Sequence, residues 1–172
     1  MQTVPTLLNS CASATTAAEA RFRIDAPIPP SRAGRVIALD EEAAAVVGRV
    51  ADLPWANARF FTCRDRLRAA DGNGASVDGL PLRGMDGSVT PLGEQLAGAD
   101  VVVMVATTDD GAASASVIGA ACTLRGIMTA GLVLSDGISV GAALSALRPH
   151  ARVLLVPAEE EDLSELLTAL RA

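Results

Sequence analysis

Short apolar runs alternate with amphipathic stretches along most of this chain. The apolar runs have the length of strands and occupy residues 36–39, 59–63, 99–106, 128–134 and 152–156. The amphipathic stretches predict helices over residues 41–53, 111–124, 139–147 and 159–171. Strands that alternate with helices in this way favour an α/β fold in which a mainly parallel sheet is joined by right-handed crossovers.

The clearest unit is the strand–helix–strand segment from Asp100 to Leu134. Its first strand, residues 99–106, is apolar on both faces, as a strand covered by helices on both sides should be. The following helix is rich in small residues, and Gly126 stands where a helix commonly ends. We therefore predict a three-layer, doubly wound, Rossmann-like domain whose mainly parallel sheet has about five to six strands.

Two regions depart from the regular alternation. Residues 1–34 end in a proline-rich stretch and predict an extended N-terminal arm, with an edge strand at residues 21–25, ahead of an α/β domain at 35–172. Residues 71–88 contain three Asp-Gly turns and predict short hairpin strands at 76–77 and 80–82. Thr90 and Pro91 are favoured at the N-cap and first position of a helix, which we expect to run to Leu96.

Composition excludes several functions. All 14 basic residues are arginine, so a Schiff-base lysine and a P-loop lysine are ruled out. A single histidine rules out a multi-histidine metal site. The net charge of −6 argues against a nucleic-acid partner. We expect no membrane partner because no apolar run is long enough to span a bilayer. Three cysteines without CxxC spacing, and no secretory signal pattern, favour the cytoplasm.

Ligands of open α/β sheets bind beyond the carboxyl ends of the strands. Nearly every predicted core strand here ends near a carboxylate, so this edge of the sheet should be acidic. Such carboxylates could cap helices, bind a hard cation or attract a cationic ligand, and the identity of any metal is left open. The candidate ligand-binding residues are Asp40, Thr107, Thr108, Asp109, Asp110, Gly111, Ser114, Asp136 and Gly137.

The segment 98–134 resembles the central strand–helix–strand unit of the tubulin/FtsZ GTPases. The resemblance lies in Gly98-Ala-Asp-Val-Val-Val-Met-Val-Ala106 and in Gly126-Ile-Met-Thr-Ala-Gly-Leu-Val133, and residues 43–63 resemble that family's first helix and second strand. It implies a nucleotide-binding domain. The phosphate-loop motifs do not match, because residues 40–43 and 107–114 carry carboxylates where the family has glycines. The chain is either a relative that has lost GTP hydrolysis or an independent product of the same strand–helix–strand physics.

Cys63 is a candidate for a reactive thiol. Cys63 precedes Arg64, which could lower a thiol pKa, but a structural thiol is the simpler interpretation. His150 follows Pro149 and is expected in a solvated turn, and Cys122 is expected in the core. No complete catalytic set emerges, which favours a protein that is not an enzyme.

The sequence thus predicts a non-catalytic Rossmann-like module that binds a partner or small ligand at the carboxyl edge of its sheet. The alternative is a divalent-cation-dependent nucleotide-binding protein of tubulin/FtsZ-like or Rossmann-like type, and the cofactor is left open. The Arg and Ala bias is typical of a GC-rich, bacterial-type genome. We also expect a homodimer, because the core has few large side chains and the arm at 1–34 could pack on a neighbour.

Overall fold

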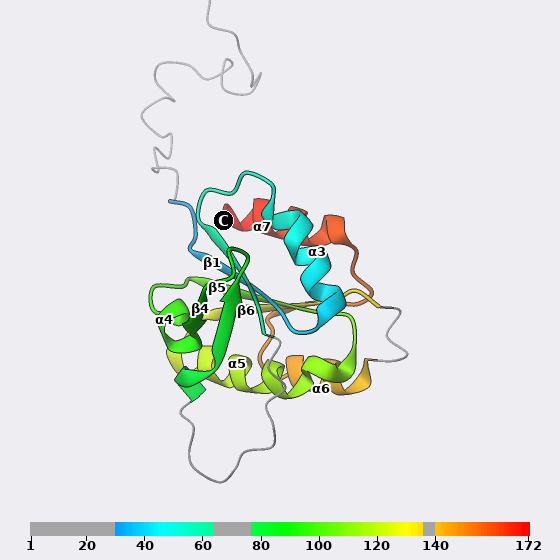
Figure 1. The fold of residues 1–172 in the computed structure, drawn as a ribbon. Coiled ribbons are helices and arrows are strands. Elements are labelled where there is room, and N and C mark those ends of the chain that lie inside the picture. Colours follow the sequence, from blue (N-terminus) through cyan, green and yellow to red (C-terminus); the bar gives the residue numbers. More distant parts are fainter. Residues whose placement is uncertain (1–29, 64–76, 136–139) are drawn as a thin grey trace, which may run out of the picture.

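A computed structural model shows how these elements are arranged (Figure 1). It describes residues 30–63, 77–135 and 140–172, called the described residues below. In chain order the described elements are β1 (Gly34–Ala38), α3 (Glu41–Ala51), β2 (Ala58–Thr62), η1 (Val77–Gly79), β3 (Pro81–Gly84), β4 (Val89–Pro91), α4 (Leu92–Leu96), β5 (Val101–Ala106), η2 (Asp109–Gly111), α5 (Ala112–Arg125), β6 (Met128–Val133), α6 (Gly141–Leu147), β7 (Val153–Leu155) and α7 (Glu160–Leu170).

The strands form one sheet in the order β4-β3-β2-β1-β5-β6-β7. β2, β1, β5, β6 and β7 pair in parallel. Counted among themselves along the chain, these five parallel strands stand in the order 2-1-3-4-5, one of the two common doubly wound arrangements. The predicted α/β fold with a mainly parallel, doubly wound sheet is confirmed.

Within the described residues the sheet has seven strands, more than the expected five to six, because the Asp-Gly-rich interval supplies an antiparallel hairpin at one edge. β3 pairs with β2 and β4 pairs with β3, across a turn in which Gly87 has a φ of 83°. Among the described residues, the register of β2 with β3 covers Phe61 and Thr62, so the amino-terminal half of β2 extends past the hairpin.

Two local predictions in this interval were wrong. Thr90 is a strand residue paired with Leu82 rather than a helix cap, and α4 begins only at Leu92, after Pro91. A β-branched residue opposite a buried leucine is better placed in a ladder than at a helix end. Val77, expected in a strand, lies in the 3-10 turn η1, and Ser76 lies outside the described residues.

The sheet separates two apolar cores. α3 and α7 cover one face, and α5 and α6 cover the other (Figure 1). Neighbouring residues of a strand point to opposite faces, so Val36 packs with α3 and α7 while Ile37 packs on the opposite side. β5, at the centre, is buried along its whole length, as its continuous apolar run predicted.

The face covered by α3 and α7 contains the chain's one tryptophan. Trp55 packs against this core, its indole Nε1 donates a hydrogen bond to the Val50 carbonyl at 2.8 Å, and its ring lies 6.4 Å from that of Phe60. This confirms that Trp55 closes the end of α3.

α7 begins with a capping box in which the Glu159 N–H donates to Asp162 Oδ2 at 2.8 Å.

The opposite face holds the one histidine. The ring of His150 lies directly over Gly119 of α5, where a Cβ atom would overlap it. Thr123 donates its hydroxyl proton to the Gly119 carbonyl at 2.9 Å, so the hydroxyl must accept from His150 Nδ1, 3.0 Å away. His150 lies in a turn, as expected, and is half-buried there because a small residue in α5 gives the imidazole a place to pack.

The end of the predicted arm is fastened to the domain. The Ala33 N–H donates to Asp100 Oδ2 at 2.8 Å, and the Arg32 N–H donates to the Arg171 carbonyl at 3.1 Å. Residues 1–29, including the strand expected at 21–25, lie outside the described residues. Within the described part of the chain, no helix is long and apolar enough to cross a bilayer.

Candidate functional site at the carboxyl edge of the sheet

The strand order places a switch point between β1 and β5. The helix that follows β1 covers one face of the sheet and the helix that follows β5 covers the other, so the two loops part at this position. Doubly wound proteins bind ligands in the crevice that results. The two loops carry most of the candidate residues, from Asp40 on the β1 side and from Thr107 on the β5 side.

Asp40 joins the two loops. Its Oδ1 accepts hydrogen bonds from the Ala43 N–H at 2.8 Å and the Thr107 hydroxyl at 2.5 Å. Its Oδ2 accepts from the backbone N–H groups of Thr107 at 2.7 Å and Thr108 at 3.1 Å. The carboxylate therefore caps α3 and also fastens the end of β5 to the end of β1.

This arrangement uses the groups that a phosphate would need. Backbone N–H groups at the start of a helix are the usual anion site of such folds. Here the N–H groups of Thr107 and Thr108 already face the charge of Asp40. A carboxylate has about four lone-pair positions, and Asp40 accepts four hydrogen bonds, so it also has little capacity left for a metal ion.

The Asp109 carboxylate is also engaged by a backbone N–H group of the fold. Its Oδ1 accepts a hydrogen bond at 2.8 Å from the N–H of Ala143, in the first turn of α6. The N-cap of α6 itself, Val140, provides no side-chain hydrogen bond, so a residue distant in sequence supplies the missing acceptor. The cap of η2 is Thr108, whose Oγ1 accepts from the Asp110 N–H at 3.4 Å.

Gly111 and Ser114 lie beneath the loop rather than at its surface. A Cβ atom on Gly111 would come within 2.7 Å of the Leu39 carbonyl oxygen, so glycine is required for the β5 loop to pack on the β1 loop. Ser114 is only 4 % exposed. The structure therefore places both residues where they support the site and not where a ligand would touch them. Asp136 and Gly137 lie outside the described residues.

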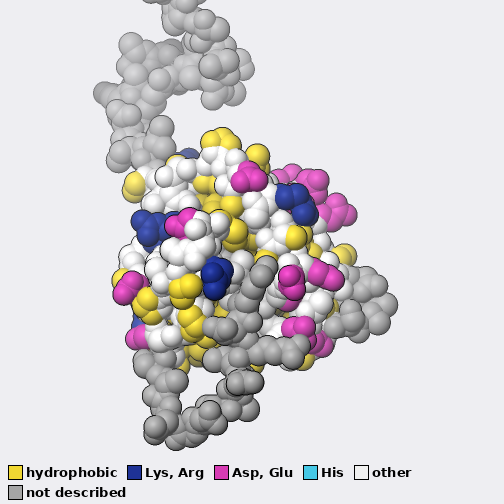
Figure 2. Space-filling model, viewed as in Figure 1, with side chains coloured by type: hydrophobic (Ala, Val, Ile, Leu, Met, Phe, Trp, Pro, Cys, Tyr) yellow, Lys and Arg dark blue, Asp and Glu magenta, His cyan; other side chains and the backbone are white. Residues whose placement is uncertain are grey.

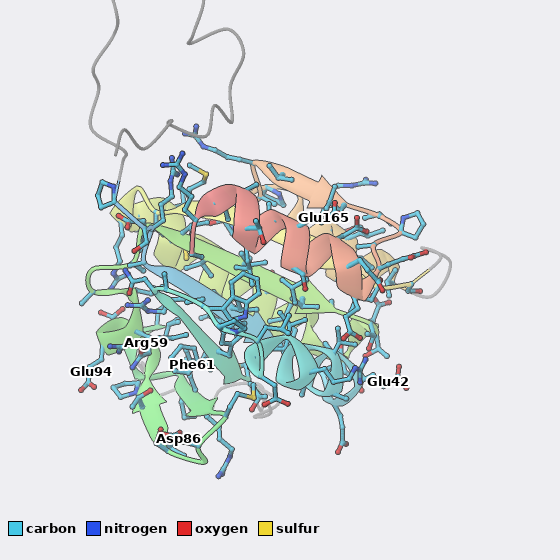
Figure 3. All side chains as sticks on the ribbon, turned by 90° about the horizontal axis from the view of Figure 1, so that it is seen from above. Glu42, Arg59, Phe61, Asp86, Glu94 and Glu165 are labelled. Carbon is cyan, nitrogen blue, oxygen red and sulfur yellow. The ribbon has the colours of Figure 1, made fainter. Side chains whose placement is uncertain are left out.

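An open hollow of about 370 Å³ lies over these loops, called the switch-point hollow below. Its lining residues are Asp40, Glu41, Glu42, Thr108 and Asp110. Glu41, Glu42 and Asp110 are exposed, and Figure 3 shows Glu42 projecting from the start of α3. Asp and Glu side chains gather on this side of the molecule (Figure 2). In the described part of the chain, no three His, Cys, Asp or Glu residues are arranged to hold a metal ion.

The two cysteines within the described ranges are both buried. Cys63 is 2 % exposed at the end of β2, which agrees with a structural thiol. Cys122 lies within the core of α5, where burial raises its pKa to about 11. A thiol with so high a pKa is protonated at neutral pH and is a poor nucleophile. The run Arg64, Arg66 and Arg68 lies outside the described residues.

Sequence reasoning missed one polar group and the true partner of another. Gln95, in α4, is buried, and no sequence pattern indicated this. Asp109, a candidate ligand residue or helix cap, accepts a hydrogen bond from the first turn of α6 rather than from its own helix. The distance along the chain between Asp109 and α6 leaves no periodic signal, but the missing cap residue before Gly141 was visible in the sequence.

Comparisons with known proteins do not assign a family. No family model matches the chain, and no curated protein matches it. Among solved structures, one match is a protein of Burkholderia pseudomallei named "Putative pilus assembly-related protein", with 14% sequence identity and a TM-score of 0.44 over 85% of this chain and 95% of that one. A likeness this weak carries no argument about function. The resemblance to tubulin and FtsZ stays a prediction.

Proposed function

We propose that this protein is a non-catalytic α/β module that binds a partner or small ligand at the carboxyl edge of its sheet, through a positively charged group of that ligand. The observation that carries the proposal is the use of the Thr107 and Thr108 N–H groups by Asp40. An anion finds these donors occupied. A cation meets the exposed carboxylates of Glu41 and Glu42.

The charges around the hollow support a cationic ligand. Glu41 and Glu42 stand in the first turn of α3, and α7 begins at the same edge with Glu160, Glu161 and Asp162. Arg49 pairs with Glu160 at 2.6 Å and neutralises part of that second group. The carboxylates that line the hollow thus dominate the local field, which raises the local concentration of cations.

The proposal is tested by NMR titration of the labelled chain with spermine and, in parallel, with GTP and Mg²⁺. Spermine should shift the amide signals of residues 41–43 and 108–111. The double variant Glu42→Gln, Asp110→Asn should weaken that response. The matched control is Glu94→Gln, Glu165→Gln, which removes the same charge from two exposed positions away from the hollow (Figure 3).

Three results would count against the proposal. If spermine leaves the edge unperturbed, or if both double variants respond alike, no cation-binding site exists here. A response of the same amides to GTP with Mg²⁺ would instead favour the alternative, a divalent-cation-dependent nucleotide-binding protein. That alternative requires the loop to release Thr107 and Thr108 from Asp40.

Homodimer formation is a separate part of the proposal. It rests on the apolar arm at residues 1–34 and on the small size of most core side chains. Sedimentation equilibrium of the full chain should give twice the monomer mass, and removal of residues 1–29 should lower it. An unchanged mass after removal would show that the arm does not hold the subunits together.

A further inference from the structure

A second polar hollow lies at the other end of the sheet, where the β3–β4 hairpin diverges from β2. It has a volume of about 460 Å³ and is called the β2 cleft below. Its walls come from the end of α3, from β2, from the hairpin turn and from α4. The lining residues used below are Arg59, Phe61, Met85, Asp86 and Gln95. The volume lies within the range of small-molecule sites in proteins.

Gln95 points to a ligand in this cleft. Its side chain is only 9 % exposed, and its Nε2 donates to Thr90 Oγ1 at 3.2 Å. Its Oε1 is buried and has no hydrogen-bond partner among the described residues. A buried acceptor without a donor is costly and uncommon in native proteins. The terminal torsion of glutamine is soft, so the amide can turn toward a donor that enters the cleft.

Arg59 supplies a cation at the same place. It is exposed on β2, and among the described residues its guanidinium has no hydrogen-bond or ion-pair partner (Figure 3). Beside it on β1 lies Arg35, which is buried and donates to the carbonyls of Gln95 and Gly34. Burial lowers the pKa of Arg35, and the charge of Arg59 lowers it further. Arg35 does not line the cleft and its guanidinium is bonded to backbone carbonyls, so Arg59 is the group that favours an anion there.

The hairpin turn adds the opposite charge. The Asp86 Oδ1 accepts hydrogen bonds from the Ser88 hydroxyl at 2.6 Å and the Ser88 N–H at 2.9 Å, and these bonds lower the pKa of Asp86. The side chain is therefore ionised at neutral pH. Phe61, on the same face of β2 as Arg59, and Met85 of the hairpin turn add apolar surface to the cleft. The cleft thus offers a cation, an anion, an unpaired acceptor and an apolar wall.

We propose that the β2 cleft binds a small zwitterion of the α-amino acid class. The carboxylate of the ligand pairs with Arg59, its ammonium donates to Gln95 Oε1 and to Asp86, and its apolar side chain packs on Phe61 and Met85. This site lies on a different edge of the sheet from the switch-point hollow, so it does not depend on the function proposed above.

The test is an NMR titration of the full chain with the standard L-amino acids at millimolar concentration. At least one apolar amino acid should shift the amide signals of Ala58, Phe60, Met85 and Ser88. Its amide derivative, which lacks the carboxylate, and its N-acetyl derivative, which lacks the ammonium, should both bind more weakly. If none of the amino acids perturbs the cleft, or if either derivative binds as well as the parent, the proposal is overturned.

Variants locate the site. Arg59→Met and Gln95→Met should each weaken binding by about tenfold or more, because each removes a hydrogen bond to a charged group. Arg83→Met is the matched control: it removes the same charge from the neighbouring strand β3, outside the residues that line the cleft, and should bind normally. Thermal unfolding of each variant separates loss of binding from loss of fold. Normal binding by folded Arg59→Met and Gln95→Met would contradict the proposal.

Discussion

At the switch point the buried Asp40 carboxylate accepts four hydrogen bonds, whereas in the β2 cleft the buried Gln95 amide leaves its oxygen without a partner. In the first region, polar groups of the β1 and β5 loops satisfy one another's hydrogen bonds and hold the two loops together. The second keeps a polar group that the fold itself does not use. The second region thus offers a ligand an unused acceptor, whereas the first, to which the fold class directs attention, offers only the exposed carboxylates around Asp40.

The substitution with the largest expected effect is Asp40→Ala. It leaves the N–H groups of Ala43, Thr107 and Thr108 without their acceptor, and bonds to a charged group are the stronger kind, so we expect a loss of about 4 kcal/mol in the free energy of unfolding. Urea unfolding measures it. Glu42→Ala, an exposed carboxylate in the same helix turn, should cost under about 1 kcal/mol. Equal losses in the free energy of unfolding for the two variants would mean that Asp40 does not hold the two loops together.

Gly111→Ala tests how closely the β5 loop packs on the β1 loop. The added methyl group would press on the Leu39 backbone, and overpacking of this kind costs about 2 kcal/mol. Gly48→Ala is the matched control, because it lies within α3 with open space around it and should stabilise the protein by up to about 1 kcal/mol. The pair of denaturation midpoints should move in opposite directions. A shift of both in the same direction would show that the loops are not closely packed.

Asp109→Ala removes the acceptor at the start of α6. Loss of a helix cap costs about 1 kcal/mol, and Asp109→Asn, which keeps an oxygen acceptor, should recover most of it. Thermal unfolding of the two variants is the measurement. If asparagine were as destabilising as alanine, the charge rather than the cap would be the contribution of Asp109.

Gln95→Leu should have the smallest effect, and one of opposite sign to the others. It removes the unpaired oxygen at the loss of one bond to Thr90, so the free energy of unfolding should stay level or rise by about 1 kcal/mol. The bond from Arg35 ends on the Gln95 backbone and survives the change. A clear destabilisation in urea would mean that Oε1 has a partner in solution, and the contrast between the two regions would disappear.

The sequence was sufficient for the fold class and for the main strands and helices because their signals are local. The apolar run of β5 and the leucine face of α7, with Leu163 and Leu167, each predict a buried surface from a short stretch of sequence. Of the roles left open for Asp40, helix capping is the one that the structure shows, and it was foreseeable because the cap and Ala43 are close in sequence. The two short hairpin strands were predicted only in part. Asp-Gly turns indicate where the chain reverses, but they do not determine which residues pair across the turn.

The chemistry of the site was less predictable, because it depends on contacts between distant residues. Nothing in the sequence tells that Asp40 meets Thr107, which turns a candidate ligand into an internal tie. Gln95 gave no signal at all, since its burial follows from the hairpin packing beside α4. Site residues are therefore recognised from which of their hydrogen bonds the fold leaves unfilled, and this appears only in three dimensions.

The division of the core into two layers has a practical consequence for spectroscopy. The chain has one tryptophan and one histidine, and they lie in different layers: Trp55 packs with α3 and α7, and His150 packs against α5. Indole fluorescence and the imidazole proton resonances thus report separately on the two sides of the sheet, without any label. Coincident transitions by both probes would establish that the layers melt as one cooperative unit.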